Sequence, residues 1–379
     1  MAVADLKELK SFYSGKKVFV TGHTGFKGTW LTRILLLAGA KVTGYSLQPP
    51  TEPNLFLRAQ LDGFDTFTDI RGDVRDFESL KKAFDGFDPD VVLHLAAQPI
   101  VRDSYKDPRY TYETNVMGTV NLLECVRLSQ EKSGVFGGKK ISILNVTTDK
   151  VYKNNEWCYG YRENEPLDGY DPYSNSKSCS ELATHSFINS FFTEGSVSVS
   201  TARAGNVIGG GDHANCRIIP DACRAVYNAI QKGESEGVVV IRNPYSTRPY
   251  QHVLEPLAMY LTIAMRQYED KKYAGFYNIG PDDCDCVTTG ELIDMFINEY
   301  NSRQGIPVRL KREDQCEEGA PHEANFLKLD NSLIKQTFGW SAKWHMTDCI
   351  AHTVDFLMAD ISGKDVSAEM DREIEDYFL

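Results

Sequence analysis

The sequence predicts an α/β protein, with a Rossmann-like, doubly wound parallel sheet and a smaller mixed α/β domain toward the C-terminus. In residues 1–204, short β-branched runs alternate with amphipathic segments whose apolar residues recur at three- and four-residue spacing. That alternation is typical of a parallel sheet whose two faces are covered by the connecting helices. A glycine-rich stretch also stands directly after the first strand candidate, where doubly wound folds bind a ligand.

The order of elements follows from these patterns. In the first part, strands are expected at Lys17–Thr21, Lys41–Ser46, Asp90–His94, Ile141–Thr147 and Ser198–Arg203. Helices are expected at Gly28–Ala38, Asp76–Phe84, Tyr110–Leu128 and Tyr173–Phe191. Later candidates are the helices Ile219–Gln231, Glu255–Tyr268 and Thr289–Glu299 and the strands Val238–Arg242, Phe276–Ile279 and Val308–Leu310. We therefore expect one domain at 1–204, to which segments such as 243–280 return, and a second mainly at 205–379, with a cleft between them.

Composition excludes several classes of protein. The formal charge of −12, with no concentrated Lys/Arg surface, argues against binding to nucleic acid. No apolar run approaches the ~20 residues of a membrane span, and the opening residues MAVADLKELKSFYSGKK have no signal-type core. The nine cysteines are scattered, and the closest pair, Cys284 and Cys286, lacks the spacing of a zinc site. We expect a cytosolic enzyme or binding protein without a metal.

The glycine-rich stretch is TGHTGFKG, with Gly22, Gly25 and Gly28 between a strand and a helix. Glycines in this context let the backbone turn sharply and approach a pyrophosphate, which the helix N-terminus then faces. Glycines also serve plain tight turns, but the flanking strand and helix favour a dinucleotide cofactor.

The choice between NAD and NADP is indicated by the second strand. It ends in GYSLQPP, without an acid for a ribose hydroxyl and without an adjacent arginine for a 2′-phosphate. Lys27 and Arg33 are the nearest basic candidates, so the sequence favours NAD. Asp73 is placed to contact adenine, and the small Ala96 and Ala97 leave room for a nicotinamide ribose, although alanines there are equally compatible with simple packing.

A possible catalytic pair is Tyr173 and Lys177, four residues apart on one helical face. A nearby ammonium favours the phenolate, so we expect Lys177 to lower the pKa of Tyr173. The tyrosine would then take a proton from an alcohol while a hydride leaves the same carbon. Asp149 and Lys150 follow a strand candidate directly, at the end where doubly wound folds place ligands.

Together these motifs resemble the extended short-chain dehydrogenase/reductase family, through TGxxGxxG, HxAA, TNVxGT at 114–119 and YxxxK. The stretches GHTGFKGTWL, HLAAQPIVRDSY, TTDKVY, GYDPYSNSK, ARAGNVIGGGD, RIIPD and RPYQHVLEPL look like the CDP-glucose 4,6-dehydratases within that family. That group has a Thr/Ser-Asp-Lys triplet where dTDP-glucose dehydratases have Thr-Asp-Glu. The resemblance implies a lyase that converts CDP-D-glucose to CDP-4-dehydro-6-deoxy-D-glucose with tightly held NAD+.

The resemblance also implies roles for the catalytic residues. Tyr173, helped by Thr148, removes the 4-hydroxyl proton, and Asp149 protonates the departing 6-hydroxyl. Two roles are open to Lys150. It acts as the C5 base only if its amine is neutral. Alternatively it stays charged and stabilises the enolate oxygen.

The expected contacts cover three sets. Catalytic residues are Thr148, Asp149, Lys150, Tyr173 and Lys177. Cofactor contacts are Gly22, Thr24, Gly25, Phe26, Lys27, Gly28, Asp73, Val74, Leu95, Ala96, Ala97, Asn115, Tyr173 and Lys177. Nucleotide-sugar contacts are Gln98, Tyr105, Asn206, Arg217, Arg248 and His252, because planar arginine forks suit phosphate oxygens. The resemblance further implies a homodimer, paired through the helices expected at 110–128 and 173–191, and the acidic tail EMDREIEDYF is expected to be a solvated helix.

Two classes of alternative remain. A dTDP-, UDP- or GDP-sugar 4,6-dehydratase or a 4-epimerase would use the same glycine loop and Tyr-Lys pair, but an epimerase has no need of a proton donor at C6, so Asp149 discriminates against it. A non-catalytic, NAD-bound scaffold is the second class. The presence of Thr148, Tyr173 and Lys177 argues against it.

Overall fold

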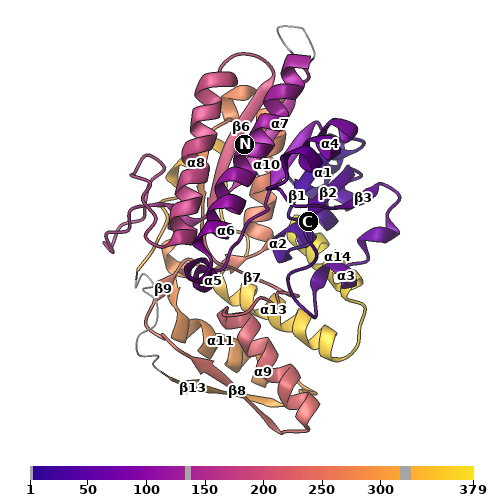
Figure 1. Cartoon of the computed structure of the whole chain (residues 1–379). Helices are drawn as coiled ribbons and strands as arrows, with labels where there is room; N and C mark the ends of the chain where they lie inside the picture. Colours follow the sequence, from indigo (N-terminus) through magenta and orange to yellow (C-terminus); the bar gives the residue numbers. More distant parts are fainter. Residues whose placement is uncertain (1–2, 133–137, 316–325) are drawn as a thin grey trace.

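The computed structural model describes residues 3–132, 138–315 and 326–379. A parallel sheet of seven strands runs through the larger part of the molecule in the order β11-β6-β5-β4-β1-β2-β3 (Figure 1). The strands are β1 Lys17–Thr21, β2 Lys41–Ser46, β3 Phe67–Arg71, β4 Val91–His94, β5 Ile141–Val146, β6 Val197–Ala204 and β11 Phe276–Ile279. The doubly wound parallel sheet is thus confirmed.

The burial of the strands explains which were recognisable from sequence. Every residue of β5 and β6 is buried, because helices cover both faces of the sheet, and β-branched residues recur along both strands. The five strands predicted for the first part agree with the structure to within one residue at each end. The missed strand is the edge strand β3, whose side chains are exposed or half-buried and have no apolar signature.

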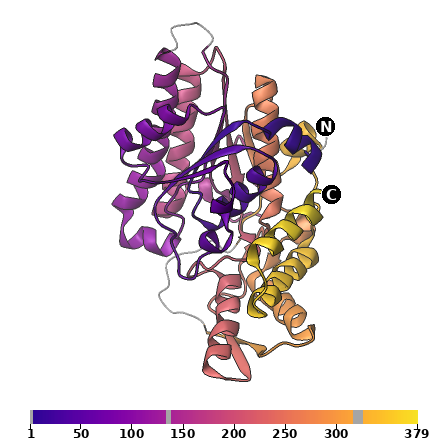
Figure 2. The same cartoon turned by 90° about the vertical axis from the view of Figure 1, so that its right-hand side faces the viewer.

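Helices lie on both sides of the sheet (Figure 2). Side chains of α4, α7 and α8 pack with those of Phe19, Val92 and Ile143 on one face. Helices α1, α2 and α10 pack with alternate strand residues such as Val18, Val20 and Leu93 on the other. The bounds of these helices are α1 Leu6–Tyr13, α2 Phe26–Leu37, α4 Phe77–Phe87, α7 Gly118–Lys132, α8 Pro172–Phe191 and α10 Leu254–Glu269.

The helix expected at Tyr110–Leu128 is in fact three consecutive segments. They are α6 Pro108–Tyr112, a π-helical turn at Glu113–Met117 and α7 Gly118–Lys132. Gly118 begins α7 where the backbone passes Val74, and a Cβ at Gly118 would lie 2.7 Å from Val74 Cγ2. A π-turn of this kind shifts the register of the side chains that follow and is frequent at functional sites.

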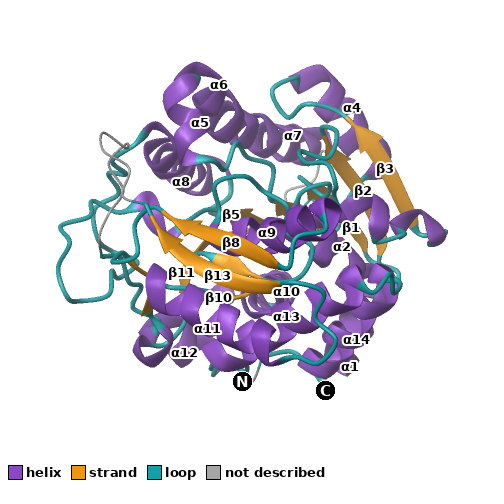
Figure 3. Ribbon diagram, turned by 90° about the horizontal axis from the view of Figure 1, so that it is seen from below, coloured by secondary structure: helices purple, strands orange, loops and turns teal. Residues whose placement is uncertain are grey.

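The smaller part of the molecule is built around the parallel strands β8 Glu236–Ile241 and β13 Arg309–Asp314, next to α9 Ile218–Lys232 and α11 Thr289–Ser302 (Figure 3). Two short strand pairs connect it to the large sheet: β7 Val207–Ile208 with β10 Gln251–His252, and β9 Thr247–Arg248 with β12 Val287–Thr288. The remaining elements are α3 Leu55–Arg58, η1 Leu61–Gly63, α5 Val101–Lys106, η3 Asp149–Val151, η4 Lys271–Tyr273, η5 Asp283–Asp285, α12 Ser332–Phe338, α13 Met346–Ile361 and α14 Val366–Phe378.

The C-terminal segment returns to the larger part of the molecule. The expectation of a solvated tail is wrong for α14, because Met370, Ile374, Tyr377 and Phe378 are buried in the core that also contains α2 and α10. The apolar residues recur at helical spacing and form this face, but the acidic residues between them obscured the pattern in the sequence. Among the described residues, no helix has the length and apolarity needed to span a membrane.

Candidate active site

A cleft of about 890 Å³ lies between the carboxyl ends of the strands and the smaller part of the molecule. This is the position in which open α/β sheets hold their ligands. It is lined by most of the residues predicted from sequence: Gly22, Thr24, Gly25, Phe26, Lys27, Gly28, Asp73, Val74, Leu95, Ala96, Ala97, Gln98, Thr148, Lys150, Tyr173, Lys177, Asn206, Arg217 and Arg248.

The glycine loop has the geometry that a dinucleotide requires. Gly22 has a φ of +78°, and a Cβ there would lie 2.7 Å from Ala96 N. A Cβ at Gly28 would lie 2.1 Å from Gly22 O, so only glycine allows the helix to start so close to the loop. Gly25 is the N-cap of α2 and makes no side-chain cap bond, which leaves backbone N–H groups of the first turn available to a pyrophosphate.

The two basic candidates for a 2′-phosphate are engaged elsewhere. The guanidinium of Arg33 is buried and donates to both carboxylate oxygens of Asp371, at 2.6 Å each. Lys27 is half-buried and lies within electrostatic range of Lys177 and Arg217, at the catalytic end of the cleft. Neither is therefore placed to select NADP.

Asn115, expected as a cofactor contact, lies behind the cleft wall. Its side chain is fully buried in the π-helical turn, accepts from Gln98 N at 2.8 Å and donates to Gln98 O at 3.1 Å and Ser176 Oγ at 2.8 Å. It fixes the loop after β4 onto α8 and does not line the cleft. The sequence could not show this, because the residue's direction depends on the π-turn.

The catalytic candidates converge where β5 and α8 meet. Tyr173 and Lys177 lie in the first turns of α8, which begins at a cap formed by Asp171, whose carboxylate accepts from Ser174 N at 3.0 Å. Thr148 is the residue before the 3-10 turn Asp149–Val151, and its hydroxyl donates to Asp149 Oδ1 at 2.9 Å. Strand end and helix start thus face the same cleft.

Asp149 is only 1% exposed and does not itself line the cleft wall. Its Oδ2 has no hydrogen-bond partner among the described residues, and a Cβ at Gly205 would approach that oxygen to 3.3 Å. Burial raises the pKa of Asp149, although the neighbouring Lys150 acts in the opposite direction. A carboxyl group in this environment can hold a proton and later give it up.

The pKa of Tyr173 differs from the sequence expectation. Burial raises it to about 12, and a hydrogen bond from Thr148 opposes this only in part. The Lys177 ammonium donates to Val146 O at 3.1 Å, and burial lowers its own pKa to about 8. The predicted lowering of the tyrosine pKa by Lys177 is therefore wrong for the protein alone, because burial dominates.

On the substrate side, Asn206, Arg217 and Arg248 line the cleft, and Arg217 Nη1 lies 3.1 Å from Asp212 Oδ2. Two predicted contacts are not brought there. Tyr105 is 42% exposed and lies outside the cleft lining.

His252 is fully buried against Trp344, with ring centroids 4.8 Å apart, and its Nε2 is 3.6 Å from Glu373 Oε2. Its prediction as a substrate contact is therefore wrong. Both residues of strand β10 are buried, and neither side chain of this strand lines the cleft.

Sequence reasoning missed the buried pair of Glu181 and Arg203 directly below the catalytic residues. A signal was present, because Glu181 follows Lys177 by one helical turn. Elsewhere, Cys284, Asp285 and His345 offer ligand atoms within 4.8 Å of one another. Asp285 already accepts from Met346 N at 2.9 Å and bonds His345 Nδ1 at 2.8 Å, which caps α13, so the group is explained by the fold.

Comparison with known proteins gives concordant relatives. A family model described as GDP-mannose 4,6 dehydratase matches residues 19–353. The CDP-glucose 4,6-dehydratase of Salmonella typhimurium is 45% identical over 374 residues, 97% of this chain and 98% of that protein. The solved dTDP-glucose 4,6-dehydratase of Bacillus anthracis has a TM-score of 0.70 at 19% identity, over 92% of this chain and 99% of that one. The UDP-glucose 4-epimerase of Stenotrophomonas maltophila has a TM-score of 0.72 at 20% identity, over 92% and 99%. At these identities the solved structures show a shared fold.

Proposed function

The chain belongs to the GDP-mannose 4,6-dehydratase family of nucleotide-sugar-modifying enzymes, and from this premise we propose that it converts CDP-D-glucose to CDP-4-dehydro-6-deoxy-D-glucose and water. The observation that carries the proposal is the buried carboxyl of Asp149, whose pKa is raised by burial, next to Thr148 and within electrostatic range of Tyr173. The relative that shares nearly the whole chain, the Salmonella enzyme, is named for this substrate.

The cleft fits NAD+, which when bound would accept the C4 hydride of the sugar and return it at C6. The glycine loop and the N-terminus of α2 would bind the pyrophosphate, and Asp73 and Val74 would contact the adenosine side. NAD is proposed over NADP because Arg33 is bound to Asp371 and Lys27 lies near Lys177. Leu95, Ala96 and Ala97 leave space beside the nicotinamide ribose.

Tyr173 takes the proton of the sugar 4-hydroxyl as C4 becomes a ketone. The Thr148 hydroxyl forms a hydrogen bond with the Tyr173 phenol and would also bond the 4-oxygen of the sugar, which would position that oxygen for proton transfer. Lys177 would hold the ribose and supply positive charge beside the phenolate that forms. The ketone makes the C5 hydrogen acidic.

Loss of water then requires a base at C5 and a proton for the leaving oxygen. Asp149 donates its proton to the 6-hydroxyl, which departs as water when the C5–C6 double bond forms. A proton returns to C5 when C6 is reduced. In sum, the sugar loses the 4-hydroxyl proton and the 6-hydroxyl group, so one water is released and no external reductant is consumed.

Lys150 lines the cleft, is half-exposed and is adjacent to Asp149. Lys150 is reached by water, which solvates an ammonium, so we propose that Lys150 stabilises the enolate oxygen as a cation. On this basis Lys150→Arg retains at least about a tenth of kcat, whereas Lys150→Met loses about 10²-fold or more. The measurement is product formation together with exchange of deuterium into C5; loss of exchange in the arginine variant would assign Lys150 as the C5 base instead.

Arg217, Arg248 and Asn206 are proposed to hold the diphosphate and the sugar. Lys27 joins this group, because burial lowers its pKa to about 8 and the neighbouring charges of Arg217 and Lys177 act in the same direction. A lysine there would meet the phosphate oxygens of the substrate.

Assembly and location are further parts of the proposal. Leu182 and Phe191 on α8 are 52% and 53% exposed, and Met117 before α7 is 49% exposed. Large apolar side chains on these helices support a homodimer paired through them.

The cysteines that the structure describes are all free thiols, which supports a reducing, cytosolic location.

The test is to incubate the purified protein with CDP-glucose without added NADH and follow the 4-keto-6-deoxy product by its absorbance in alkali. Parallel reactions with dTDP-, UDP- and GDP-sugars measure the preference for the base. We expect turnover, with CDP-glucose as the best substrate. A product with an axial 4-hydroxyl would indicate epimerisation. Absence of any reaction with every sugar would support the alternative of a non-catalytic, NAD-bound scaffold.

A further inference from the structure

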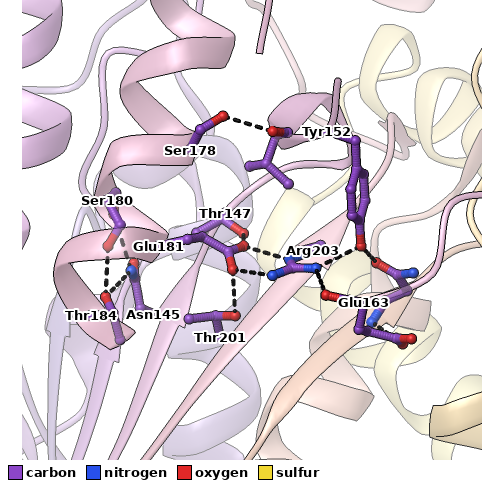
Figure 4. A network of polar contacts seen from close by, with 12 residues as sticks. Asn145, Thr147, Tyr152, Glu163, Ser178, Ser180, Glu181, Thr184, Thr201 and Arg203 are labelled. Atoms are coloured by element: carbon purple, nitrogen blue, oxygen red, sulfur yellow. Dashed lines mark hydrogen bonds and ion pairs between the residues drawn. The ribbon is translucent and has the colours of Figure 1, made fainter. Parts of the chain in front are cut away.

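A buried polar network joins α8 to β6 and to the residue that follows β5 (Figure 4). At its centre is Glu181 of α8, only 1% exposed, whose carboxylate accepts four hydrogen bonds. Oε1 accepts from Thr147 Oγ1 at 2.5 Å and Arg203 Nε at 2.8 Å. Oε2 accepts from Thr201 Oγ1 at 3.0 Å and Arg203 Nη2 at 2.6 Å.

Arg203 of β6 is equally enclosed, at 2% exposure. Its Nη1 donates to Tyr152 Oη at 2.7 Å and Glu163 O at 2.9 Å, and the guanidinium lies 5.0 Å from the centre of the Tyr152 ring. Burying two charges costs free energy that their attraction often only just offsets, and apolar pairs are frequently as stable. Stability alone therefore does not explain why the fold has an ion pair at this place.

The position of the pair suggests a role in the site. Thr147, which donates a hydrogen bond to Glu181, directly follows β5 and immediately precedes Thr148 and Asp149. Lys177 lies one helical turn before Glu181 on α8. The same helix is fixed to the 3-10 turn by Ser178 Oγ, which donates to Val151 O at 2.7 Å.

Lys177 is surrounded by groups of different charge. Tyr173 and Glu181 lie one helical turn before and after it on α8, and His94 of β4 and Lys27 in the first turn of α2 lie within electrostatic range. His94 carries no charge that would help, because burial lowers its pKa to about 3. Lys27 is of like sign.

Asp149, on the 3-10 turn, raises the pKa of Lys27. Glu181 is thus the carboxylate that counters the burial of Lys177.

We propose that Glu181, held in place by Arg203, is a positioning residue that keeps the Lys177 ammonium ionised and fixes the Thr147–Asp149 segment against α8. The inference rests on the proposed function, since that is what requires a charged Lys177. It adds a residue that acts through Lys177 and through the end of β5, without touching the sugar.

The first test is the pH profile of kcat for Glu181→Gln. Without the carboxylate, burial lowers the pKa of Lys177 further, so its proton is lost at lower pH and the alkaline limb of the profile moves down by about one unit. Thr201→Val is the matched control, because it removes one bond to the same carboxylate and leaves the charge. We expect the control to lower Tm and leave the limb in place.

A second test needs no turnover. Lys177 has a pKa near 8 in the folded protein and an ordinary value near 10.4 when unfolded. Below pH 8 Lys177 is protonated in both the folded and the unfolded protein. Burial of its charge then destabilises the folded state, and Glu181 offsets part of this cost. The Tm deficit of Glu181→Gln relative to Thr201→Val should therefore shrink as the pH rises past 8.

Each outcome decides the inference separately from the proposed function. Parallel Tm curves and identical limbs for the two variants would overturn it. An inactive wild-type protein overturns the proposed function, and the Tm curves still test the role of Glu181. If Glu181→Gln alone does not fold, because it leaves Arg203 unpaired, Glu181→Gln with Arg203→Met removes both charges and should show smaller shifts in the same direction, since loss of the cation partly offsets loss of the carboxylate; no shift would overturn the inference.

Discussion

Asp149→Asn is expected to separate the two halves of the reaction, abolishing release of water while leaving oxidation at C4. An asparagine retains the shape of the side chain and can still accept from Thr148, but it has no proton to transfer to the 6-hydroxyl. We expect formation of the 4-keto-6-deoxy product to fall about 10²–10⁴-fold, the usual contribution of a positioned proton donor. Reduced nicotinamide should accumulate on the enzyme, visible by its absorbance.

The matched control is Asp212→Asn, which alters a second buried carboxyl at the cleft. Asp212 bonds Arg217 and has no path to C6 in the proposed arrangement, so its loss should weaken substrate binding and slow oxidation and dehydration together. If Asp149→Asn also slows both steps equally, the carboxyl does not act as the acid. If it forms product at the wild-type rate, the dehydratase proposal loses the observation that carries it.

Most of the fold could be predicted from the sequence because its central strands are buried on both faces. Strands such as β1 and β5 are rich in β-branched and other apolar residues, and the helices between them have a regular apolar stripe. The edge strand β3 and the tail helix α14 could not be recognised in this way. In both, polar letters dominate locally, and it is tertiary packing that decides what is buried.

The site was predictable where backbone position determines the side chain's place. Gly22, Gly28 and Tyr173 follow from the strand-loop-helix order, and the structure brings all three to the cleft. Asn115 and His252 were misplaced because their position depends on a π-turn and on a two-residue strand whose residues are both buried. Neither feature has a signature in a single sequence.

The electrostatics were the least predictable part. The spacing of Tyr173 and Lys177 is correct, yet the sequence does not show how deeply both are buried, and burial raises the pKa of the phenol to about 12. Asp149 was proposed as an acid because of the family resemblance and its place at a strand end, and the structure adds the cause of its raised pKa, which is desolvation.

The family fold is compatible with both epimerisation and dehydration, so the fold cannot decide between them. The decision depends on residues added to a shared oxidation site. In the proposed mechanism, Tyr173 and Lys177 would serve any reaction that begins at C4, whereas a buried carboxyl with a raised pKa at the end of β5 would be needed only if an oxygen must leave protonated. Asp149 therefore distinguishes the reactions, and Tyr173 does not.

Tyr173→Phe should in consequence block the reaction before the step at which Asp149→Asn stops it. Phenylalanine cannot take the 4-hydroxyl proton, so reduced nicotinamide and product should both fall about 10²–10⁴-fold. The measurement is a single turnover with CDP-glucose, in which both signals are followed. Tyr170→Phe, three residues earlier and 75% exposed, is the matched control and should be unchanged.

The pH dependence gives a further check on the same residue. The phenol must lose its proton to act as base, and its pKa is raised, so the rate of oxidation should increase with pH until Lys177 begins to lose its own proton near pH 8. Thr148→Val removes a hydrogen bond that lowers this pKa, and should therefore move the rise to higher pH. Oxidation that persists in Tyr173→Phe, or a rise that Thr148→Val leaves in place, would mean that another group accepts the proton.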